Sequence, residues 1–187
     1  MADLIGRKLV VVGDCGVGKT CLLAVYAKGK FPTKSVPTMY DNYIMEMEVD
    51  GTGVELGLWD TPGNGDYDRL RLLIYPKAHV ILLCFAIDSP NSLANAQSKW
   101  MPEVRHHCPE VPVVLVGCKN DLRDGAGGPA TVHVSSDQGK EAAEAIGAVK
   151  YLQCSAKGAK GVRELFQYAA KVSLQPPKKN KKDCSIQ

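Results

Sequence analysis

The stretch Lys8-Leu-Val-Val-Val-Gly-Asp-Cys-Gly-Val-Gly-Lys-Thr20 decides the fold of this chain. A β-branched run, residues 8–13, leads into Gly13-Asp-Cys-Gly-Val-Gly-Lys19-Thr20, which has the spacing G-x-x-x-x-G-K-[ST]. A helical pattern follows at 18–28, and this strand–loop–helix context lets backbone N–H groups and a helix N-terminus surround phosphates. The stretch predicts a phosphate loop in which Lys19 holds the outer phosphates and Thr20 ligates Mg²⁺.

Outward from this loop, short apolar runs recur along the chain. Most are almost continuously hydrophobic, which is typical of parallel strands covered on both faces. Residues 43–49 instead alternate Met and Val with Glu, and this pattern predicts a half-exposed edge strand before a turn at Asp50-Gly51. The other strands are expected at 8–13, 54–60, 78–88, 111–117 and 149–154.

Helical patterns separate these strands. They cover residues 18–28, 68–75, 91–107, 136–147 and 161–174. Such alternation predicts the α/β class: a doubly wound, mostly parallel six-stranded sheet with one antiparallel edge strand, flanked by about five helices.

Composition and charge divide the chain into two parts. The 187 residues carry a formal charge of +3. Four lysines and Asp183 account for all of it within residues 176–187, so residues 1–175 are neutral. We therefore expect one globular domain over 1–175 with a glycine-rich surface insertion at 124–130, a basic tail over 176–187, and no nucleic-acid binding. The longest apolar run, residues 80–87, is too short to span a bilayer, and seven scattered cysteines are typical of reduced cytosolic thiols.

A second motif indicates which base is bound. Gly117-Cys-Lys-Asn-Asp121 follows a strand, at the edge where open α/β sheets bind ligands. The Asp121 carboxylate can accept hydrogen bonds from N1–H and the 2-amino group of guanine, and adenine lacks that donor pair. Cys154-Ser-Ala-Lys157, after the last strand, supplies a second loop beside the same base.

Taken together, these motifs resemble the Rho family of small GTPases. The resemblance rests on GDCGVGKT, FPTKSVPTMYDNY, WDTPG, YDRLR, CKND, CSAK and the terminal CSIQ, and extends from about Arg7 to the end of the chain. It implies a P-loop NTPase fold, GTP/GDP and Mg²⁺ as ligands, and a monomer. It also implies effectors that bind loops 31–43 and 60–76, guanine-nucleotide exchange factors, GTPase-activating proteins and a dissociation inhibitor as partners.

The resemblance also implies residue roles. Phe31 would pack on the guanine edge, Thr38 would ligate Mg²⁺ in the triphosphate state, and Asp60 would hold Mg²⁺ through water. Gly63 would sense the γ-phosphate, and Ala156 N–H would meet guanine O6. Catalysis would involve Lys19, Gly63 and Asn64. The expected nucleotide-binding set is Cys15, Gly16, Val17, Gly18, Lys19, Thr20, Cys21, Phe31, Thr38, Asp60, Gly63, Cys118, Lys119, Asp121, Leu122, Ser155, Ala156 and Lys157.

Departures from the family pattern cluster where hydrolysis would occur. Asn64 replaces the glutamine that orients water, and it is shorter by one C–C bond, ~1.5 Å. Cys15 replaces a glycine beside the γ-phosphate, and Pro62 replaces an alanine. Gly65 loosens the following loop. We predict slow GTP hydrolysis and a poor response to activating proteins.

Two further departures lie elsewhere in the predicted site, and the tail carries a lipidation motif. Ser35 replaces the switch-one tyrosine, and Cys118 replaces the asparagine that ties the base loop to the phosphate loop. The tail has only Cys184, in Cys184-Ser-Ile-Gln187, as a lipidation site, and its terminal Gln favours farnesyl. A single lipid gives only marginal membrane anchoring, so the four lysines would supply a second signal by binding an anionic membrane. We therefore expect the protein on the cytoplasmic face of membranes, with a further pool in the cytosol.

Alternative functions remain open from sequence. A normally cycling GTPase is one, with Asn64 or a partner's residue positioning the water. A scaffold that does not respond to nucleotide is another, because Pro62 and Ser35 could prevent the switch. A P-loop kinase for a small molecule is disfavoured, because Asp121 and residues 155–157 form base-reading loops and no acceptor lid is evident.

Overall fold

The structure, a computed structural model, describes residues 4–33, 42–123 and 133–176. Expectations for Ser35, Thr38, the insertion at 124–130, Cys184 and the lysines of the tail fall outside these described residues.

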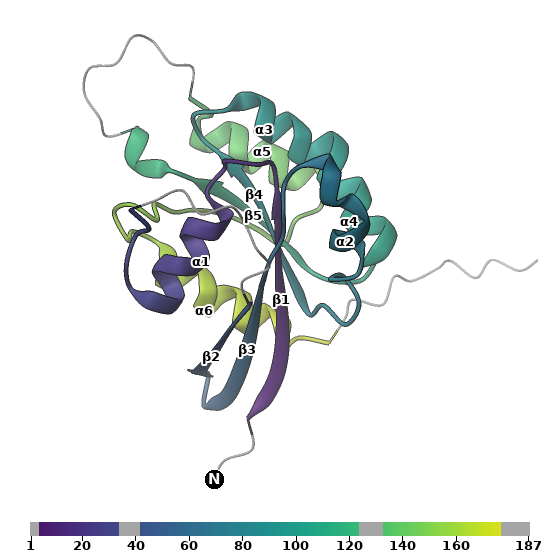
Figure 1. The fold of residues 1–187 in the computed structure, drawn as a ribbon, viewed down its shortest axis with the longest axis vertical. Helices are drawn as coiled ribbons and strands as arrows, with labels where there is room; N and C mark the ends of the chain where they lie inside the picture. Colours follow the sequence, from purple (N-terminus) through teal and green to yellow (C-terminus); the bar gives the residue numbers. More distant parts are fainter. Residues whose placement is uncertain (1–3, 34–41, 124–132, 177–187) are drawn as a thin grey trace, which may run out of the picture.

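Six strands form one sheet in the order β2-β3-β1-β4-β5-β6 (Figure 1). Their bounds are β1 (Ile5–Gly13), β2 (Asn42–Val49), β3 (Thr52–Asp60), β4 (Val80–Ala86), β5 (Val113–Cys118) and β6 (Lys150–Gln153). The β2–β3 pair is antiparallel and every other pair is parallel. The predicted fold class is therefore confirmed.

Alternate residues of the central strands pack into two separate cores. In β1, Leu9 and Val11 face one side of the sheet and Val10 and Val12 the other, and all four are fully buried. Because both faces are covered, a strand needs no polar face, which explains the continuous apolar runs.

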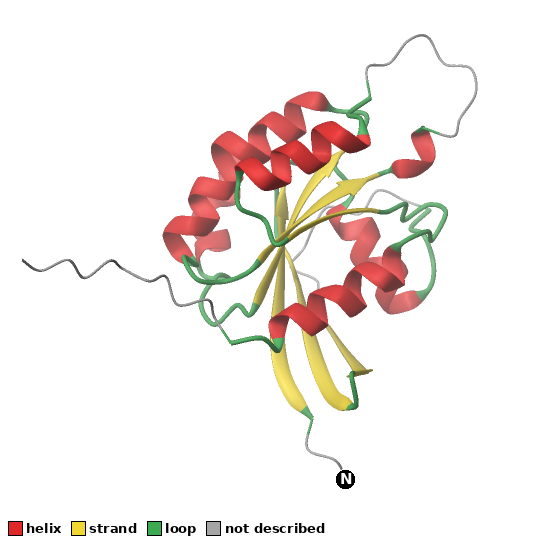
Figure 2. Cartoon of the chain, turned by 180° about the vertical axis from the view of Figure 1, so that it is seen from behind, coloured by secondary structure: helices red, strands yellow, loops and turns green. Residues whose placement is uncertain are grey.

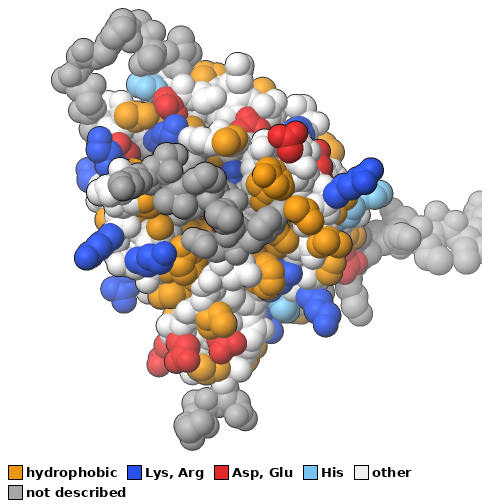
Figure 3. Space-filling view, in the orientation of Figure 1, with side chains coloured by type: hydrophobic (Ala, Val, Ile, Leu, Met, Phe, Trp, Pro, Cys, Tyr) orange, Lys and Arg blue, Asp and Glu red, His pale blue; other side chains and the backbone are white. Residues whose placement is uncertain are grey.

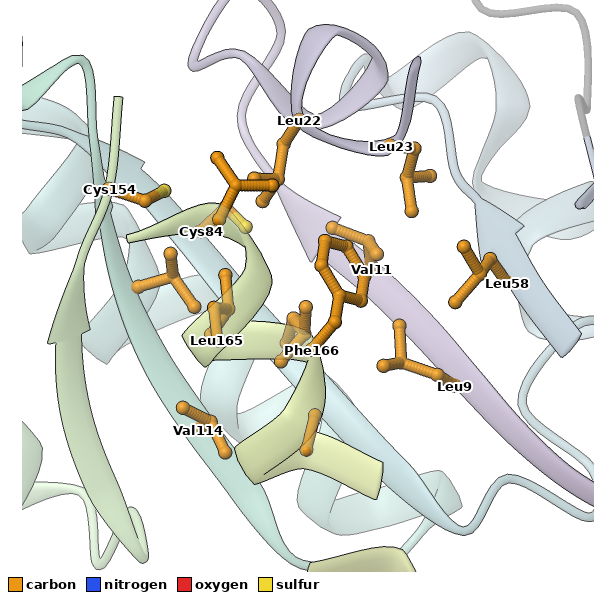
Figure 4. Close-up of a cluster of buried hydrophobic side chains, with 14 of the residues drawn as sticks. Leu9, Val11, Leu22, Leu23, Leu58, Cys84, Val114, Cys154, Leu165 and Phe166 are labelled. Carbon is orange, nitrogen blue, oxygen red and sulfur yellow. The ribbon is translucent and has the colours of Figure 1, made fainter. Parts of the chain in front are cut away.

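Helices cover both faces of the sheet (Figure 2). On one face lie α1 (Lys19–Lys28) and α6 (Val162–Ser173), where Phe166 points toward Leu9 and Val11 of β1 (Figure 4). The opposite face carries α3 (Pro90–Asn95), α4 (Met101–His107) and α5 (Ser136–Ala145). Helix α5 begins with a capping box, in which Ser135 and Gln138 exchange hydrogen bonds.

Two of the expected helices are less regular than the sequence predicts. The 68–75 helix is a short α2 (Asp68–Leu72) after a 3₁₀ turn, η1 (Gly65–Tyr67). The 91–107 helix is interrupted between α3 and α4 by a π-helical turn, η2 (Ala96–Trp100). No helix in the described ranges has the length and apolar character needed to cross a bilayer.

Strand β2 is a half-exposed edge, as its alternating sequence predicts. The β2–β3 hairpin closes through Asp50 and Gly51, which have φ values of 49° and 80°. Positive φ at both turn residues matches the twist of a two-residue hairpin. Acidic side chains gather at this end of the sheet (Figure 3).

Candidate nucleotide-binding site

A cavity of about 220 Å³ lies at the carboxyl-end loops of the sheet. This is the edge at which doubly wound sheets bind ligands. Ten of its twelve lining residues belong to the set expected from sequence, and Leu22 and Cys154 are the other two. The ten are Gly16, Gly18, Cys21, Phe31, Cys118, Lys119, Asp121, Leu122, Ala156 and Lys157.

The phosphate loop (residues 13–20) joins β1 to α1 and needs its glycines. Gly13 has φ of 140°, and a Cβ there would lie 2.1 Å from the carbonyl oxygen of Cys84. Gly18, the residue before α1, has φ of 107°. Only glycine adopts such backbone freely, so the loop can pass close to β4 and then turn into the helix.

Lys19 lies inside this loop. Its Nζ donates to the carbonyl oxygens of Gly13, at 2.8 Å, and Asp14, at 2.7 Å. Burial lowers the pKa of Lys19, and the nearby charge of Asp60 opposes that shift. A buried cation beside a turn of backbone N–H groups is suited to an anionic ligand.

Thr20 and Asp60 form the predicted metal position. The Thr20 hydroxyl donates to Oδ2 of Asp60 at 2.6 Å, and Asp60 is buried at the end of β3. Hydroxyl and carboxylate oxygens are the ligands that Mg²⁺ prefers, so this donor pair fits the metal. The third predicted ligand, Thr38, lies outside the described residues.

The two base loops are held together by direct hydrogen bonds. Ser155 donates to Oδ1 of Asp121 at 2.5 Å, and Gly158 N–H donates to Ser155 Oγ at 2.9 Å. Asn120 N–H donates to the carbonyl oxygen of Cys154 at 3.1 Å. These bonds fix the Asp121 carboxylate at the cavity wall.

Cys118 belongs to a buried thiol cluster at the wall of the cavity. Its thiol is hydrogen-bonded to those of Cys154 and Cys84, and these bonds hold the pKa of Cys118 well below its ordinary value. Its Cβ would lie 3.8 Å from a Cβ on Gly18. The Cys118 side chain therefore lies beside Gly18 of the phosphate loop, and both residues line the cavity.

The hydrolysis positions lie where the segment after β3 crosses the phosphate loop. Gly63 packs so closely that an added Cβ would lie 2.3 Å from Cys15 N. Asn64 is exposed, and its Nδ2 donates to Oδ2 of Asp66 at 3.4 Å. Cys15 is also exposed.

Sequence reasoning missed a polar network beneath this segment. The fully buried Arg71 donates to both carboxylate oxygens of Glu103 at 2.8 Å, to Asp68 at 2.7 Å and to the carbonyl oxygen of Pro62 at 3.3 Å. Tyr75 adds a 2.6 Å hydrogen bond to Glu103. The one local signal for it is the i, i+3 spacing of Asp68 and Arg71, which allows an ion pair on a helix but does not show that Arg71 is buried.

Comparison with known proteins agrees with this geometry. Residues 8–175 match the model of the Ras family. The chain is 52% identical over 191 residues to the GTP-binding protein RHO1 of Candida albicans, with 96% of this chain and 95% of that protein covered. It is 48% identical over 202 residues to the GTP-binding protein rho5 of Schizosaccharomyces pombe, with both chains covered completely. It is also 54% identical over 179 residues to Rho1 of Kluyveromyces lactis, covering 91% of this chain and 85% of that one.

Proposed function

Because this chain belongs to the Rho family of small GTPases and is a Rho-type GTP-binding molecular switch, we propose that it hydrolyses GTP slowly and acts on effectors from an anionic membrane. The family implies guanine nucleotide with Mg²⁺, and exchange factors, activating proteins and effectors as partners. The body over residues 1–175 would bind nucleotide, and residues 176–187 would bind membrane.

One observation carries the slow-hydrolysis proposal: Gly63 packs directly on the backbone at Cys15. The two substituted positions, Cys15 and Asn64, therefore lie on segments that touch. A side chain at position 15 would crowd the γ-phosphate and an incoming arginine finger. The shorter Asn64 would hold water about 1 Å or more out of place, which costs on the order of 100-fold in rate.

Pro62 adds to the same effect. It is buried, and its carbonyl oxygen accepts a hydrogen bond from Arg71 at 3.3 Å. Its ring fixes φ and removes one N–H. The start of the segment 60–76 is thereby stiffened next to the position where water would be oriented.

The nucleotide and metal would be held by residues already in place. Mg²⁺, coordinated by Thr20 and held through water by Asp60, would neutralise charge on the phosphates. Lys19 would bind the outer phosphates, and Asp121, oriented by Ser155, would accept hydrogen bonds from guanine. Phe31, Leu122 and Lys119 would enclose the base.

Effectors would bind the loops 31–43 and 60–76. The second loop exposes three large apolar side chains: Tyr67, Leu70 and Leu73 are 45%, 46% and 73% exposed. Grouped exposed hydrophobic side chains of this kind are typical of protein-binding surfaces.

Single-turnover GTP hydrolysis tests the catalytic part. Wild type, Cys15→Gly, Asn64→Gln and the double variant would be loaded with GTP and followed with and without a Rho-type activating protein. We expect the double variant to be faster by on the order of 100-fold. A wild-type rate equal to that of the double variant identifies a normally cycling GTPase instead. Purified protein that binds no guanine nucleotide identifies a scaffold.

Vesicle binding tests the membrane part. Farnesylated wild type would be compared with Cys184→Ser and with a variant in which Lys178, Lys179, Lys181 and Lys182 are glutamine. Each lysine is expected to add about 1 kcal/mol on vesicles containing phosphatidylserine. Salt should weaken this contribution. Equal binding of wild type and the glutamine variant would remove the lysines from the anchor.

A further inference from the structure

The π-helical turn η2 brings together two side chains that an α-helix would separate. Asn95 and Trp100 are five residues apart, and at 3.6 residues per turn an α-helix would point them in different directions. The i→i+5 hydrogen bonds of a π-turn bring such residues onto neighbouring turns of one side. Both side chains reach the same carboxylate, that of Asp14 in the phosphate loop.

The two contacts form a clamp on Asp14, one donor to each carboxylate oxygen. Asn95 Nδ2 donates to Oδ2 at 2.8 Å, and Trp100 Nε1 donates to Oδ1 at 2.7 Å. Trp100 is fully buried. Hydrogen bonds to an ionised carboxylate are stronger than neutral ones, and geometry of this kind fixes orientation.

The backbone of Asp14 also lies next to two residues of the predicted site, Lys19 and Gly63. Its carbonyl oxygen accepts the 2.7 Å hydrogen bond from Lys19. A Cβ on Gly63 would lie 2.4 Å from the carbonyl carbon of Asp14. A shift of Asp14 would therefore move both the lysine and the backbone against which Gly63 packs.

Trp100 extends the connection to the segment 60–76. The Arg71 guanidinium carbon lies 4.6 Å from the Trp100 ring centroid, a cation–π distance. The same guanidinium donates to the carbonyl oxygen of Pro62. One buried indole thus contacts groups from both loops that would surround the γ-phosphate.

We propose that Asn95 and Trp100 are positioning residues that hold the phosphate loop through Asp14 and thereby set how slowly bound nucleotide is released. This inference rests on the guanine-nucleotide binding proposed above. The clamp keeps Lys19 and the loop backbone in their phosphate-binding arrangement, so nucleotide does not have to order them. Loss of either donor lets the loop move and speeds release.

Release of a fluorescent GDP analogue from the full chain tests the clamp. Trp100→Phe keeps an aromatic ring for Arg71 but removes the N–H together with part of the buried indole, while Asn95→Ala removes the second donor and leaves the indole intact. The matched control is Ser98→Ala, because Ser98 is exposed in the same π-turn and, among the residues that the structure describes, its hydroxyl donates to the carbonyl oxygen of Ala94 in α3 and not to Asp14. We expect about tenfold faster release from Trp100→Phe, in line with loss of a hydrogen bond to a charged group, a smaller increase from Asn95→Ala, and no change from Ser98→Ala.

The double variants separate positioning from simple loss of packing. In an Asp14→Ala background, Trp100→Phe and Asn95→Ala should cause no further increase in the release rate. The clamp would be overturned if each substitution increased the release rate equally in the wild-type and Asp14→Ala backgrounds. It would also be overturned if both single variants released the analogue at the wild-type rate. If Trp100→Phe does not fold, the comparison of Asn95→Ala alone with Asn95→Ala in the Asp14→Ala background tests the clamp by itself. If the wild-type protein does not retain the analogue at all, nucleotide binding itself is refuted. If the wild-type protein retains it and the variants release it at the same rate, only the clamp is refuted.

Discussion

The Ser155 hydroxyl lies 2.5 Å from Oδ1 of Asp121 and donates its hydrogen bond there, so one base loop orients the residue that reads the base on the other. Ser155 is fully buried, and its oxygen also accepts from Gly158 N–H at 2.9 Å. The hydroxyl is therefore used in both directions, as donor and as acceptor.

Ser155→Ala should speed guanine-nucleotide release. The variant leaves the Asp121 carboxylate without its orienting donor, and hydrogen bonds to charged groups contribute roughly 1.5–3 kcal/mol, which is on the order of 10- to 100-fold. Stopped-flow release of labelled GDP measures it, with Ser98→Ala as a control for the loss of a hydroxyl elsewhere. Unchanged release would mean that Asp121 is held adequately without Ser155.

Glu103→Gln should destabilise the fold in a pH-dependent way. Burial would raise the pKa of Glu103, but hydrogen bonds from Arg71 and Tyr75 outweigh burial and hold it below its ordinary value of 4.5. The stabilisation is therefore complete above the ordinary pKa and is lost as pH falls through the lower, folded value. We expect a cost of about 2–3 kcal/mol near neutral pH, because Arg71 stays buried with Asp68 as its remaining carboxylate.

Urea unfolding at a series of pH values measures this effect. The difference in the free energy of unfolding between wild type and Glu103→Gln should be constant down to about pH 5 and should become smaller below that pH. Glu141→Gln, at an exposed position on α5, is the control and should change stability little. A gap independent of pH would show that the variant acts through packing instead of charge.

Bound nucleotide should protect a particular cysteine from alkylation. Cys21 and Cys118 line the cavity, whereas Cys108 lies elsewhere, with its thiol against the carbonyl oxygen of Tyr75. With GDP and Mg²⁺ added, we expect modification of the half-buried Cys21 to slow, whereas the buried Cys118 and Cys108 should react slowly with or without nucleotide. Peptide mass spectrometry after timed iodoacetamide treatment resolves each thiol. Protection that extends equally to Cys108 would indicate general stabilisation and not occupancy of the cavity.

The fold could be predicted from sequence because its signals are local. The continuous apolar run at residues 80–87 requires cover on both faces, and the Met–Glu alternation of β2 requires an edge. The spacing of the phosphate loop likewise brings Lys19 and Thr20 together within a single turn. In each of these cases, neighbouring residues carry the information.

The polar network could not be predicted because its partners are distant in sequence. Arg71 and Glu103 are 32 residues apart, and Trp100 and Asp14 are 86 apart. An arginine four residues after Tyr67 on a short helix has the pattern of a surface residue, yet this one is fully buried. The π-turn that aligns Asn95 with Trp100 leaves no periodicity that differs from an ordinary amphipathic helix. Its Ala96, Trp100 and Val104 spacing suits core packing.

Gly63 and Gly65 differ in what surrounds them, and their alanine variants should differ accordingly. A Cβ on Gly63 would meet Cys15 N at 2.3 Å and Gly13 O at 2.6 Å, all of it backbone that cannot turn aside. A Cβ on Gly65 would find only Asp68 Oδ2, at 3.9 Å. Gly63→Ala should therefore force the segment 60–76 away from the phosphate loop, at a cost of about 1–3 kcal/mol, and slow GTP hydrolysis further.

Gly65→Ala should instead be neutral or stabilising by up to about 1 kcal/mol, because it restricts the unfolded chain without a clash. Thermal unfolding of the GDP-loaded proteins, together with single-turnover hydrolysis, compares the two variants directly. Equal effects of the two would mean that the contact between Gly63 and the phosphate loop contributes nothing specific. If only Gly63→Ala lowers both stability and rate, that contact couples the segment 60–76 to the position where GTP is cleaved.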